Sequence, residues 1–234
     1  MDDLTLLVDK LKNAFHDRLV SAVLYGSAAP GGNEDSFSDL NVLCVLKEIT
    51  PRELADAEPV VRWWRGLEHP APILMSELET TQSTDSFPIE FYDMQERRQV
   101  LFGVDVIEHL KVDAKNYRTQ VEHELRAKLF RLRQHAMYVL SDGPALLNLC
   151  LNSSSTFCVL GRHALRLCGI QVATERRVVI RKLGEVLHTD MQAFHELLDL
   201  RERPEARSAS DPHKLFANYL ECIRKVVEYV DALG

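Results

Sequence analysis

The sequence predicts an α/β (α+β) domain, with a mixed sheet and flanking helices, followed by an all-α helical bundle. Three observations indicate this fold class. Short apolar segments alternate with helical patterns up to about residue 110, only long helical patterns follow, and the balance of charge changes at the same place. We therefore expect two domains, residues 1–110 and residues 111–234.

The first domain begins with apolar residues at helical spacing, which predict an amphipathic helix over residues 3–16. A second helix is expected from Pro51, because Thr50 is a suitable N-cap and proline is favoured at the first helical position. Short apolar runs predict five strands, at residues 19–25, 41–46, 71–76, 88–94 and 99–103. Strands that alternate with helices indicate an α/β domain.

The second domain shows only helical periodicity. One long helix is predicted over residues 117–140, and its apolar stripe comprises Leu125, Leu129, Leu132, Ala136 and Val139. Asp142-Gly143-Pro144 separates it from a second helix at 144–168, which Gly169 closes. Further helices are expected at 174–188, 190–201 and 212–233, and residues 201–211 are expected to form a mobile loop. This half is therefore interpreted as a helical bundle that serves as a substrate or partner domain.

Composition narrows the classes of function. Residues 1–110 hold 9 Lys and Arg against 20 Asp and Glu, whereas residues 111–234 hold 19 against 15. The difference reflects either two ordinary solvated surfaces or an acidic, metal-holding half and a basic half with a polyanion between them. The net charge of −7 disfavours DNA as a partner.

The sequence also disfavours a membrane protein and a protein stabilised by disulfide bonds. No apolar run approaches the roughly 18 residues that span a membrane, and the acidic, amphipathic N-terminus predicts a cytoplasmic protein. The five cysteines have no paired spacing, so we expect reduced and mostly buried thiols.

Residues of types suited to phosphate and metal binding lie next to the ends of the first two predicted strands. Gly26-Ser27 follows the strand at 19–25, and Asp39 precedes the strand at 41–46. Glycine lets a backbone approach a ligand closely, and a serine hydroxyl with nearby N–H groups suits phosphate oxygens. A carboxylate at the same end of an antiparallel strand pair suits a divalent cation that bridges phosphates.

The order of these residues resembles the signature of the DNA polymerase β-type nucleotidyltransferases, which is Gly-Ser, then Asp-x-Asp or Asp-x-Glu opening a strand. Within this superfamily the chain is similar to the minimal bacterial group that includes the kanamycin-type nucleotidyltransferases, in which a helical bundle follows. The resemblance covers roughly residues 20–103. It implies transfer of a nucleoside monophosphate from ATP or another triphosphate to a hydroxyl group, with Mg²⁺ (or Mn²⁺).

Residue by residue, the resemblance assigns triphosphate binding to Gly26 and Ser27 and the first metal ligand to Asp39. Asn41 stands where the family has its second carboxylate. Its amide oxygen either binds the metal without supplying charge, or Asn41 simply hydrogen-bonds to the Gly26-Ser27 turn.

The third carboxylate of the signature is expected in the predicted strand at 88–94. Glu90 and Asp93 fall on opposite faces of such a strand, so only one of them points at Asp39. We favour Glu90, because it would lie deeper in an apolar strand, and keep Asp93 as the alternative.

The long helix of the second domain carries a basic face. Lys128, Arg131 and His135 recur at i, i+3 and i+7, away from the apolar stripe. We predict that Lys128 and Arg131 contact the triphosphate, because arginine's planar fork suits phosphate. A solvated helix surface is the alternative.

Two functions follow as hypotheses. The first is a metal-dependent nucleotidyltransferase whose acceptor hydroxyl belongs to a small molecule or a protein. The second is a weakened or inactive nucleotide-binding regulatory module, which Asn41 would mark. A membrane partner is not expected, and a homodimer is left open.

Overall fold

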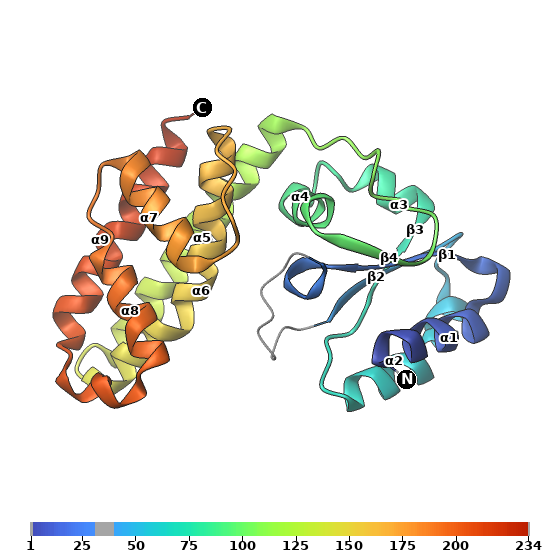
Figure 1. Ribbon diagram of the computed structural model, residues 1–234, viewed down its shortest axis with the longest axis horizontal. Coiled ribbons are helices and arrows are strands. Elements are labelled where there is room, and N and C mark those ends of the chain that lie inside the picture. The colour runs from blue at the N-terminus through green and yellow to red at the C-terminus, as the bar shows by residue number, and fades with distance from the viewer. Residues whose placement is uncertain (1, 31–39, 234) are drawn as a thin grey trace. The chain divides into compact units, whose positions relative to one another are not determined.

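The computed structural model describes residues 2–30 and 40–233. Within these residues, four strands form one sheet in the order β3-β2-β1-β4 (Figure 1). The strands are β1 (Leu19–Tyr25), β2 (Asn41–Leu46), β3 (Ile73–Ser76) and β4 (Arg98–Gly103). The bounds of β1 and β2 are those that the apolar runs predict.

The sheet is mixed, as expected from the sequence. β1 lies in the middle and pairs antiparallel with both β2 and β4, whereas β2 and β3 are parallel. At the end of β1, Tyr25 pairs with Asn41 on one side and with Arg98 on the other. The last residue of β1 therefore lies between the first residues of its two neighbours.

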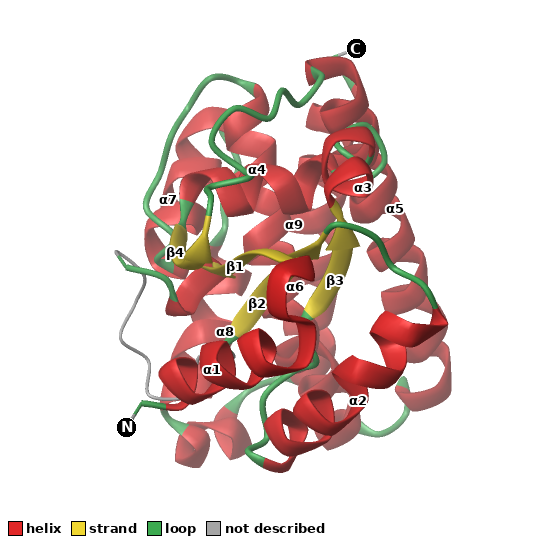
Figure 2. Cartoon of the chain, turned by 90° about the vertical axis from the view of Figure 1, so that its right-hand side faces the viewer, coloured by secondary structure: helices red, strands yellow, loops and turns green. Residues whose placement is uncertain are grey.

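Two helices cover one face of the sheet (Figure 2). Leu7 and Leu11 of α1 (Asp3–Phe15) and Trp64 of α2 (Pro51–Gly66) pack in one core with buried side chains of β1 and β2. The N-terminus of α2 has a capping box between Thr50 and Glu53, which satisfies backbone N–H groups that would otherwise lack partners.

The other face of the sheet packs against α4 (Pro88–Glu96). Phe91 and Met94 of this helix share a core with Val23, Leu43 and Ile107. The expected strand at 88–94 is therefore wrong. Pro88 is well suited to the first position of a helix, and Pro88, Phe91 and Met94 are buried at a spacing of three residues, which places them along one helical face.

A short helix between β3 and α4 was not expected. α3 (Glu77–Gln82) begins at Ser76, whose hydroxyl accepts a hydrogen bond from the backbone N–H of Glu79. The carboxylate of Glu79 accepts one in return from the backbone N–H of Ser76. The pattern Ser-x-x-Glu is the sequence signature of such a start.

After β4 every regular element of the described chain is a helix. The α-helices are α5 (Ala114–Val139), α6 (Gly143–Leu167), α7 (Arg176–Leu187), α8 (Gln192–Glu202) and α9 (Pro212–Asp231). Residues 204–209, expected to lie in a mobile loop, instead form the 3₁₀ helix η3 (Pro204–Ala209). Arg207 fixes this segment, because its Nε donates to the carbonyl oxygen of Leu200 at 3.0 Å.

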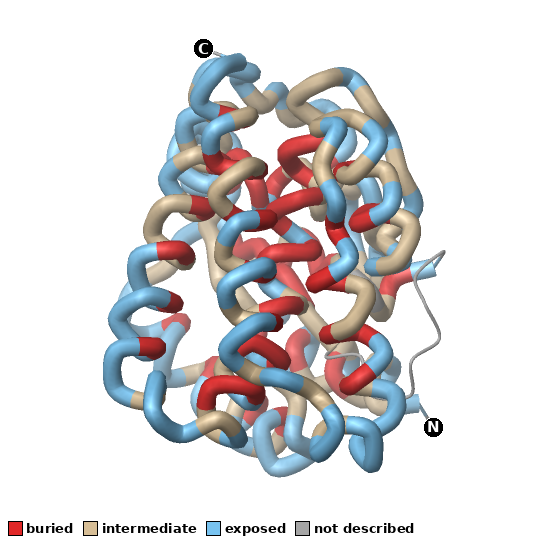
Figure 3. Tube along the Cα trace, turned by 90° about the vertical axis from the view of Figure 1, so that its left-hand side faces the viewer, coloured by how far each residue is buried: buried red, intermediate tan, exposed pale blue. Residues whose placement is uncertain are grey.

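Buried positions recur along the bundle helices with exposed positions between them (Figure 3). α6 packs against α7, α8 and α9, and the ring of Tyr219 on α9 makes edge contacts with Phe157 of α6 and Phe194 of α8. The predicted stripe of α5 is buried at Leu125, Leu129, Leu132 and Ala136. These helices thus bury a core of their own.

By its internal contacts, the chain divides into two compact units, residues 1–117 and residues 118–234. All five cysteines are free thiols, and all but Cys168 are buried. No helix in the described chain combines the length and the apolar character needed to cross a bilayer.

Candidate functional site

The turn that follows β1 is held by backbone hydrogen bonds. Gly26 opens the 3₁₀ turn η2 (Gly26–Ala28) with φ +83°, a left-handed conformation that favours glycine. Its N–H donates to the carbonyl oxygen of Arg97 at 3.2 Å, and its own carbonyl oxygen accepts from the N–H of Ala29 at 3.2 Å. The turn is therefore fixed to the segment that leads into β4.

Asn41 lies against this turn. It begins β2 opposite Tyr25, and its side-chain nitrogen is 3.6 Å from the point where a Cβ atom on Gly26 would lie. The glycine and the asparagine that the sequence singles out are thus brought together at one corner of the sheet. This placement suits both interpretations of Asn41, as support for the turn and as an oxygen ligand beside it.

Asp39, the expected first metal ligand, lies outside the described residues, and the side chain of Ser27 is likewise not described. Asp39 precedes Asn41 by two positions in the chain, and its assignment stays a prediction.

Glu90 and Asp93 lie on a helix, which changes the expectation for both. Glu90 is in the first turn of α4 and is exposed, so it is not the buried strand carboxylate that we expected. Asp93 is partly buried. Residues three apart are neighbours on one helical face, so the two carboxylates do not point to opposite sides.

Glu90 is close enough to the end of β1 to act on Tyr25. Burial raises the pKa of the half-buried Tyr25 hydroxyl, and the negative charge of Glu90 raises it further. Tyr25 packs against the same core as Phe91 and Met94 of α4, so the helix that carries Glu90 lies on the Tyr25 side of the sheet. The sequence signal that could have predicted this position is Pro88, because a helix that starts at this proline has Glu90 in its first turn.

Arg97 is a residue at this corner that the sequence analysis missed. Its carbonyl oxygen accepts the hydrogen bond from Gly26, and its Nη1 is buried without a hydrogen-bond partner among the described residues. The neighbouring Arg98 differs, because its Nε–H is shared between the two carboxylate oxygens of Asp105, at 2.9 and 3.0 Å. The only sequence signal was a pair of arginines just before an apolar run.

Within the described part of the chain, no three His, Cys, Asp or Glu side chains lie together as a metal-binding group. Glu90 and Asn41 offer one carboxylate and one amide oxygen, which are ligand types that Mg²⁺ accepts. The assignment of Asp39, Asn41 and Glu90 as metal ligands stays a prediction.

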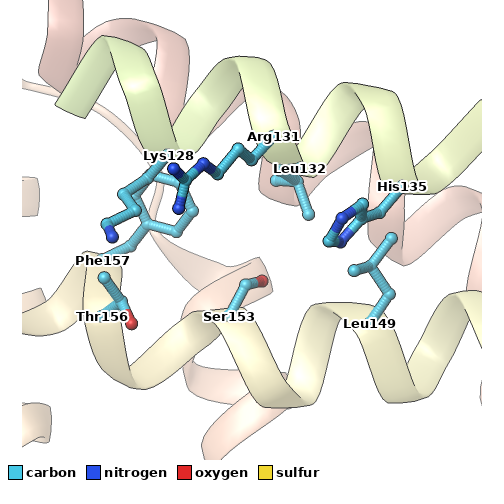
Figure 4. A pocket seen from close by; sticks show the side chains of 8 residues that line it. All are labelled: Lys128, Arg131, Leu132, His135, Leu149, Ser153, Thr156 and Phe157. Atoms are coloured by element: carbon cyan, nitrogen blue, oxygen red, sulfur yellow. The ribbon is translucent and has the colours of Figure 1, made fainter. Parts of the chain in front are cut away.

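Lys128 and Arg131 lie in the helical unit. With His135 they line one side of a pocket between α5 and α6 (Figure 4). The predicted shared face is therefore correct for all three residues. Arg126, by contrast, binds Glu122 and Asp231 at 2.8 and 3.0 Å.

The sheet, its covering helices and the bundle define a nucleotidyltransferase-like fold: a mixed four-stranded sheet with flanking helices, followed by a helical region. Neither a protein-family model nor a curated protein sequence matches the chain. Among solved structures, the chain is similar to a spectinomycin adenyltransferase from Enterococcus faecialis, crystallised with ATP and spectinomycin. The TM-score is 0.59 at 13% sequence identity, over 98% of each chain. At this identity the likeness shows the fold.

Proposed function

We propose that this protein is a nucleotidyltransferase, which transfers a nucleoside monophosphate from ATP or another triphosphate to a hydroxyl group. The observation that carries this proposal is the corner at the end of β1. There, a left-handed glycine turn lies against Asn41, and the charge of Glu90 reaches Tyr25, the residue before the turn. The nucleotidyltransferase-like fold supports the proposal, because its solved neighbour was crystallised with ATP.

In this proposal the turn binds the triphosphate. Gly26 allows close approach of the backbone, and Ser27 offers a hydroxyl group to phosphate oxygens. Lys128 and Arg131 are proposed to contact the triphosphate as well. Their positive charges would offset the negative charge of the phosphates.

Asp39, Asn41 and Glu90 would hold Mg²⁺ or Mn²⁺, with Asp93 as the alternative to Glu90. When bound, the metal polarises the phosphoryl oxygens and neutralises charge on the departing pyrophosphate. Two carboxylates and one amide oxygen of the chain would position it. The set carries one negative charge less than three carboxylates would, so we expect weaker metal binding.

The reaction forms one bond and breaks another. The acceptor oxygen attacks the α-phosphorus, the bond from that phosphorus to the bridging oxygen breaks, and pyrophosphate leaves. Glu90 is exposed, so an incoming acceptor can reach its carboxylate. We propose that a carboxylate of this corner, Asp39 or Glu90, accepts the hydroxyl proton.

The acceptor is proposed to be a small molecule or a protein side chain with a hydroxyl group. Spectinomycin is the small molecule found with the solved neighbour. We propose that the helical unit, residues 118–234, provides acceptor or partner contacts, because bundles of this kind build their sites from side chains on facing helices.

One observation favours a second candidate function. Asn41 lies against the turn at the position where the resemblance implies a carboxylate. A site with one carboxylate fewer would bind nucleotide but transfer it slowly or not at all. The protein would then be a nucleotide-binding regulatory module.

A transfer assay separates the two candidates. The protein is incubated with Mg²⁺ and triphosphates labelled at the α-phosphate, together with panels of hydroxylated small molecules and proteins. We expect label on an acceptor, with release of pyrophosphate that Asp39→Ala abolishes. Nucleotide binding without transfer to any acceptor, with Asn41→Asp equally inactive, would instead support the regulatory module.

A further inference from the structure

A pocket of about 110 Å³ lies between two neighbouring helices of the bundle. Side chains of α5 and α6 project into it from opposite sides (Figure 4). Its polar lining is Lys128, Arg131, His135, Ser153 and Thr156. The described residues that line it all belong to residues 118–234, so this lining comes from one unit.

The charge of the pocket is positive and poorly compensated. No acidic side chain is among its lining residues, and Arg131 and His135 have no hydrogen-bond or ion-pair partner in the described chain. Among the described residues, Lys128 has one ion-pair partner, Glu124, whose carboxylate lies 3.7 Å from its Nζ. Two permanent positive charges therefore face the pocket.

The hydroxyl groups of the pocket differ in what they offer a ligand. The Ser153 hydroxyl donates to the carbonyl oxygen of Cys150 at 3.1 Å, so in the 3.0 Å contact with Tyr219 the tyrosine is the donor. Ser153 is therefore committed within the protein. Thr156 is exposed and has no partner among the described residues, so its hydroxyl is available to donate.

Apolar side chains close the rest of the pocket. Leu132 and Phe157 are 3% and 4% exposed, and Leu149 is partly buried. Such a wall suits the apolar or aromatic body of a ligand rather than a fully hydrated ion. The lining thus combines two permanently charged side chains, one hydroxyl group available to donate, and an aromatic surface.

We propose that this pocket binds the phosphate group of a small organic molecule. A phosphate monoester carries a charge of about −1.5 to −2 near pH 7, which matches Lys128 and Arg131, whereas a carboxylate supplies only −1. Pockets for whole drug-sized ligands span about 300–1,000 Å³. This pocket of about 110 Å³ therefore holds the phosphate and only part of the organic group attached to it.

The inference goes beyond the proposed function, because binding in this pocket requires no transfer reaction. It shares Lys128 and Arg131 with the proposed triphosphate contacts. The phosphate therefore has two possible sources: the triphosphate of the nucleotide, or a separate phosphorylated compound. Both have the same chemistry, and a competition experiment distinguishes them.

Phenyl phosphate is the probe, because it joins a phosphate group to an aromatic ring. Its binding to the full chain is measured by calorimetry at fixed ionic strength, beside benzoate and benzylamine. We expect phenyl phosphate to bind more tightly than benzoate, and benzylamine not to bind. Arg131→Ala should weaken phenyl phosphate binding about ten- to a hundredfold, and Arg131→Lys should weaken it less.

Arg133→Ala is the matched control. Arg133 is exposed on the same helix, outside the pocket, and its loss removes the same charge. We expect little change in this variant. Absence of phenyl phosphate binding at millimolar concentration, equal binding of benzoate, or equal losses in Arg131→Ala and Arg133→Ala would overturn the proposal.

Competition with Mg²⁺-ATP then names the source of the phosphate. If Mg²⁺-ATP displaces phenyl phosphate, the pocket binds the triphosphate of the nucleotide. If both bind at once, the pocket binds a second phosphorylated compound. Asp39→Ala separates this proposal from the proposed function. It should abolish Mg²⁺-ATP binding while leaving phenyl phosphate bound, and loss of both ligands in a folded Asp39→Ala protein would overturn a separate pocket.

Discussion

The side-chain nitrogen of Asn41 lies 3.6 Å from the point that a Cβ atom on Gly26 would occupy. The residue that follows β1 and the residue that opens β2 therefore meet at one corner of the sheet. The hydrogen bond from Gly26 to the carbonyl oxygen of Arg97 ties the segment before β4 to the same corner.

Gly26→Ala is expected to lower the free energy of unfolding by about 1–2 kcal/mol, because an L-residue is strained in a left-handed conformation. Steric contact is not the cause, since a Cβ atom would lie at an ordinary distance from Asn41. Urea denaturation measures the change. Gly66→Ala is the control, because it lies in α2 with open space around it and should be neutral or stabilising. Equal effects in the two variants would contradict the strain at Gly26.

Asn41→Asp should increase metal-dependent turnover, because the change adds a carboxylate of nearly the same shape beside the turn. The rate of nucleotide transfer as a function of Mg²⁺ concentration measures it, and we expect half-saturation at a lower concentration. Asn41→Ala should lose activity in the same assay. If Asn41→Asp is slower than the wild type at every Mg²⁺ concentration, Asn41 supports the turn instead of binding the metal.

Glu90→Gln should lower the pKa of Tyr25, because the charge of Glu90 helps to raise it. NMR of labelled tyrosine, titrated with pH, measures this shift. Transfer activity should fall at least tenfold in the same variant if Glu90 is a ligand or the proton acceptor.

Asp93→Asn is the matched control for Glu90→Gln, since it removes a carboxylate from the same helix, three residues further on. The pKa of Tyr25 should stay unchanged in this variant, because its raised value has burial and Glu90 as causes. A larger loss of activity in Asp93→Asn than in Glu90→Gln would assign the third carboxylate to Asp93.

Acid should destabilise the first unit through Glu53. Hydrogen bonds from Thr50 and then from Arg18 lower the pKa of Glu53 from 4.5 to about 2. A lowered pKa in the folded state stabilises the protein above pH 4.5, and this contribution is lost as the pH falls toward 2. The stability difference between wild type and Glu53→Gln should therefore shrink over this range.

Chemical denaturation at pH 5.5, 4 and 2.5 measures that difference. Glu58→Gln on the same helix is the control, because Glu58 is exposed and pairs only with Arg62 among the described residues. A difference between wild type and Glu53→Gln that stays constant with pH would show that the carboxylate is not specifically stabilised in the folded protein.

Periodicity and caps predicted most of the fold. β1, β2 and the start of α2 follow from apolar runs and from Thr50-Pro51, where local signals and tertiary packing agree. The segment at 88–94 was wrongly predicted to be a strand, because Ile89 and Phe91 fit both a strand and a helix. A short apolar run does not separate the two, and Pro88 was the signal that favours the helix.

The site was less predictable, because it depends on contacts between distant segments. Gly26 and Asn41 were identified from their order in the chain, and the antiparallel pairing of β1 with β2 brings them together. Arg97 was missed, since its role at the corner comes from a backbone carbonyl, which no residue type encodes. The pocket beside Arg131 also depends on α6, whose register against α5 cannot be read from sequence spacing.

Binding of Mg²⁺-ATP to the wild type and to Asp39→Ala, measured by calorimetry, tests most directly whether the corner at Gly26 is a nucleotide site. We predict binding in the wild type that requires the metal, and its loss in an Asp39→Ala protein that remains folded. Absence of triphosphate binding to the wild type, or binding that Asp39→Ala leaves unchanged, would contradict a metal–triphosphate site at this corner.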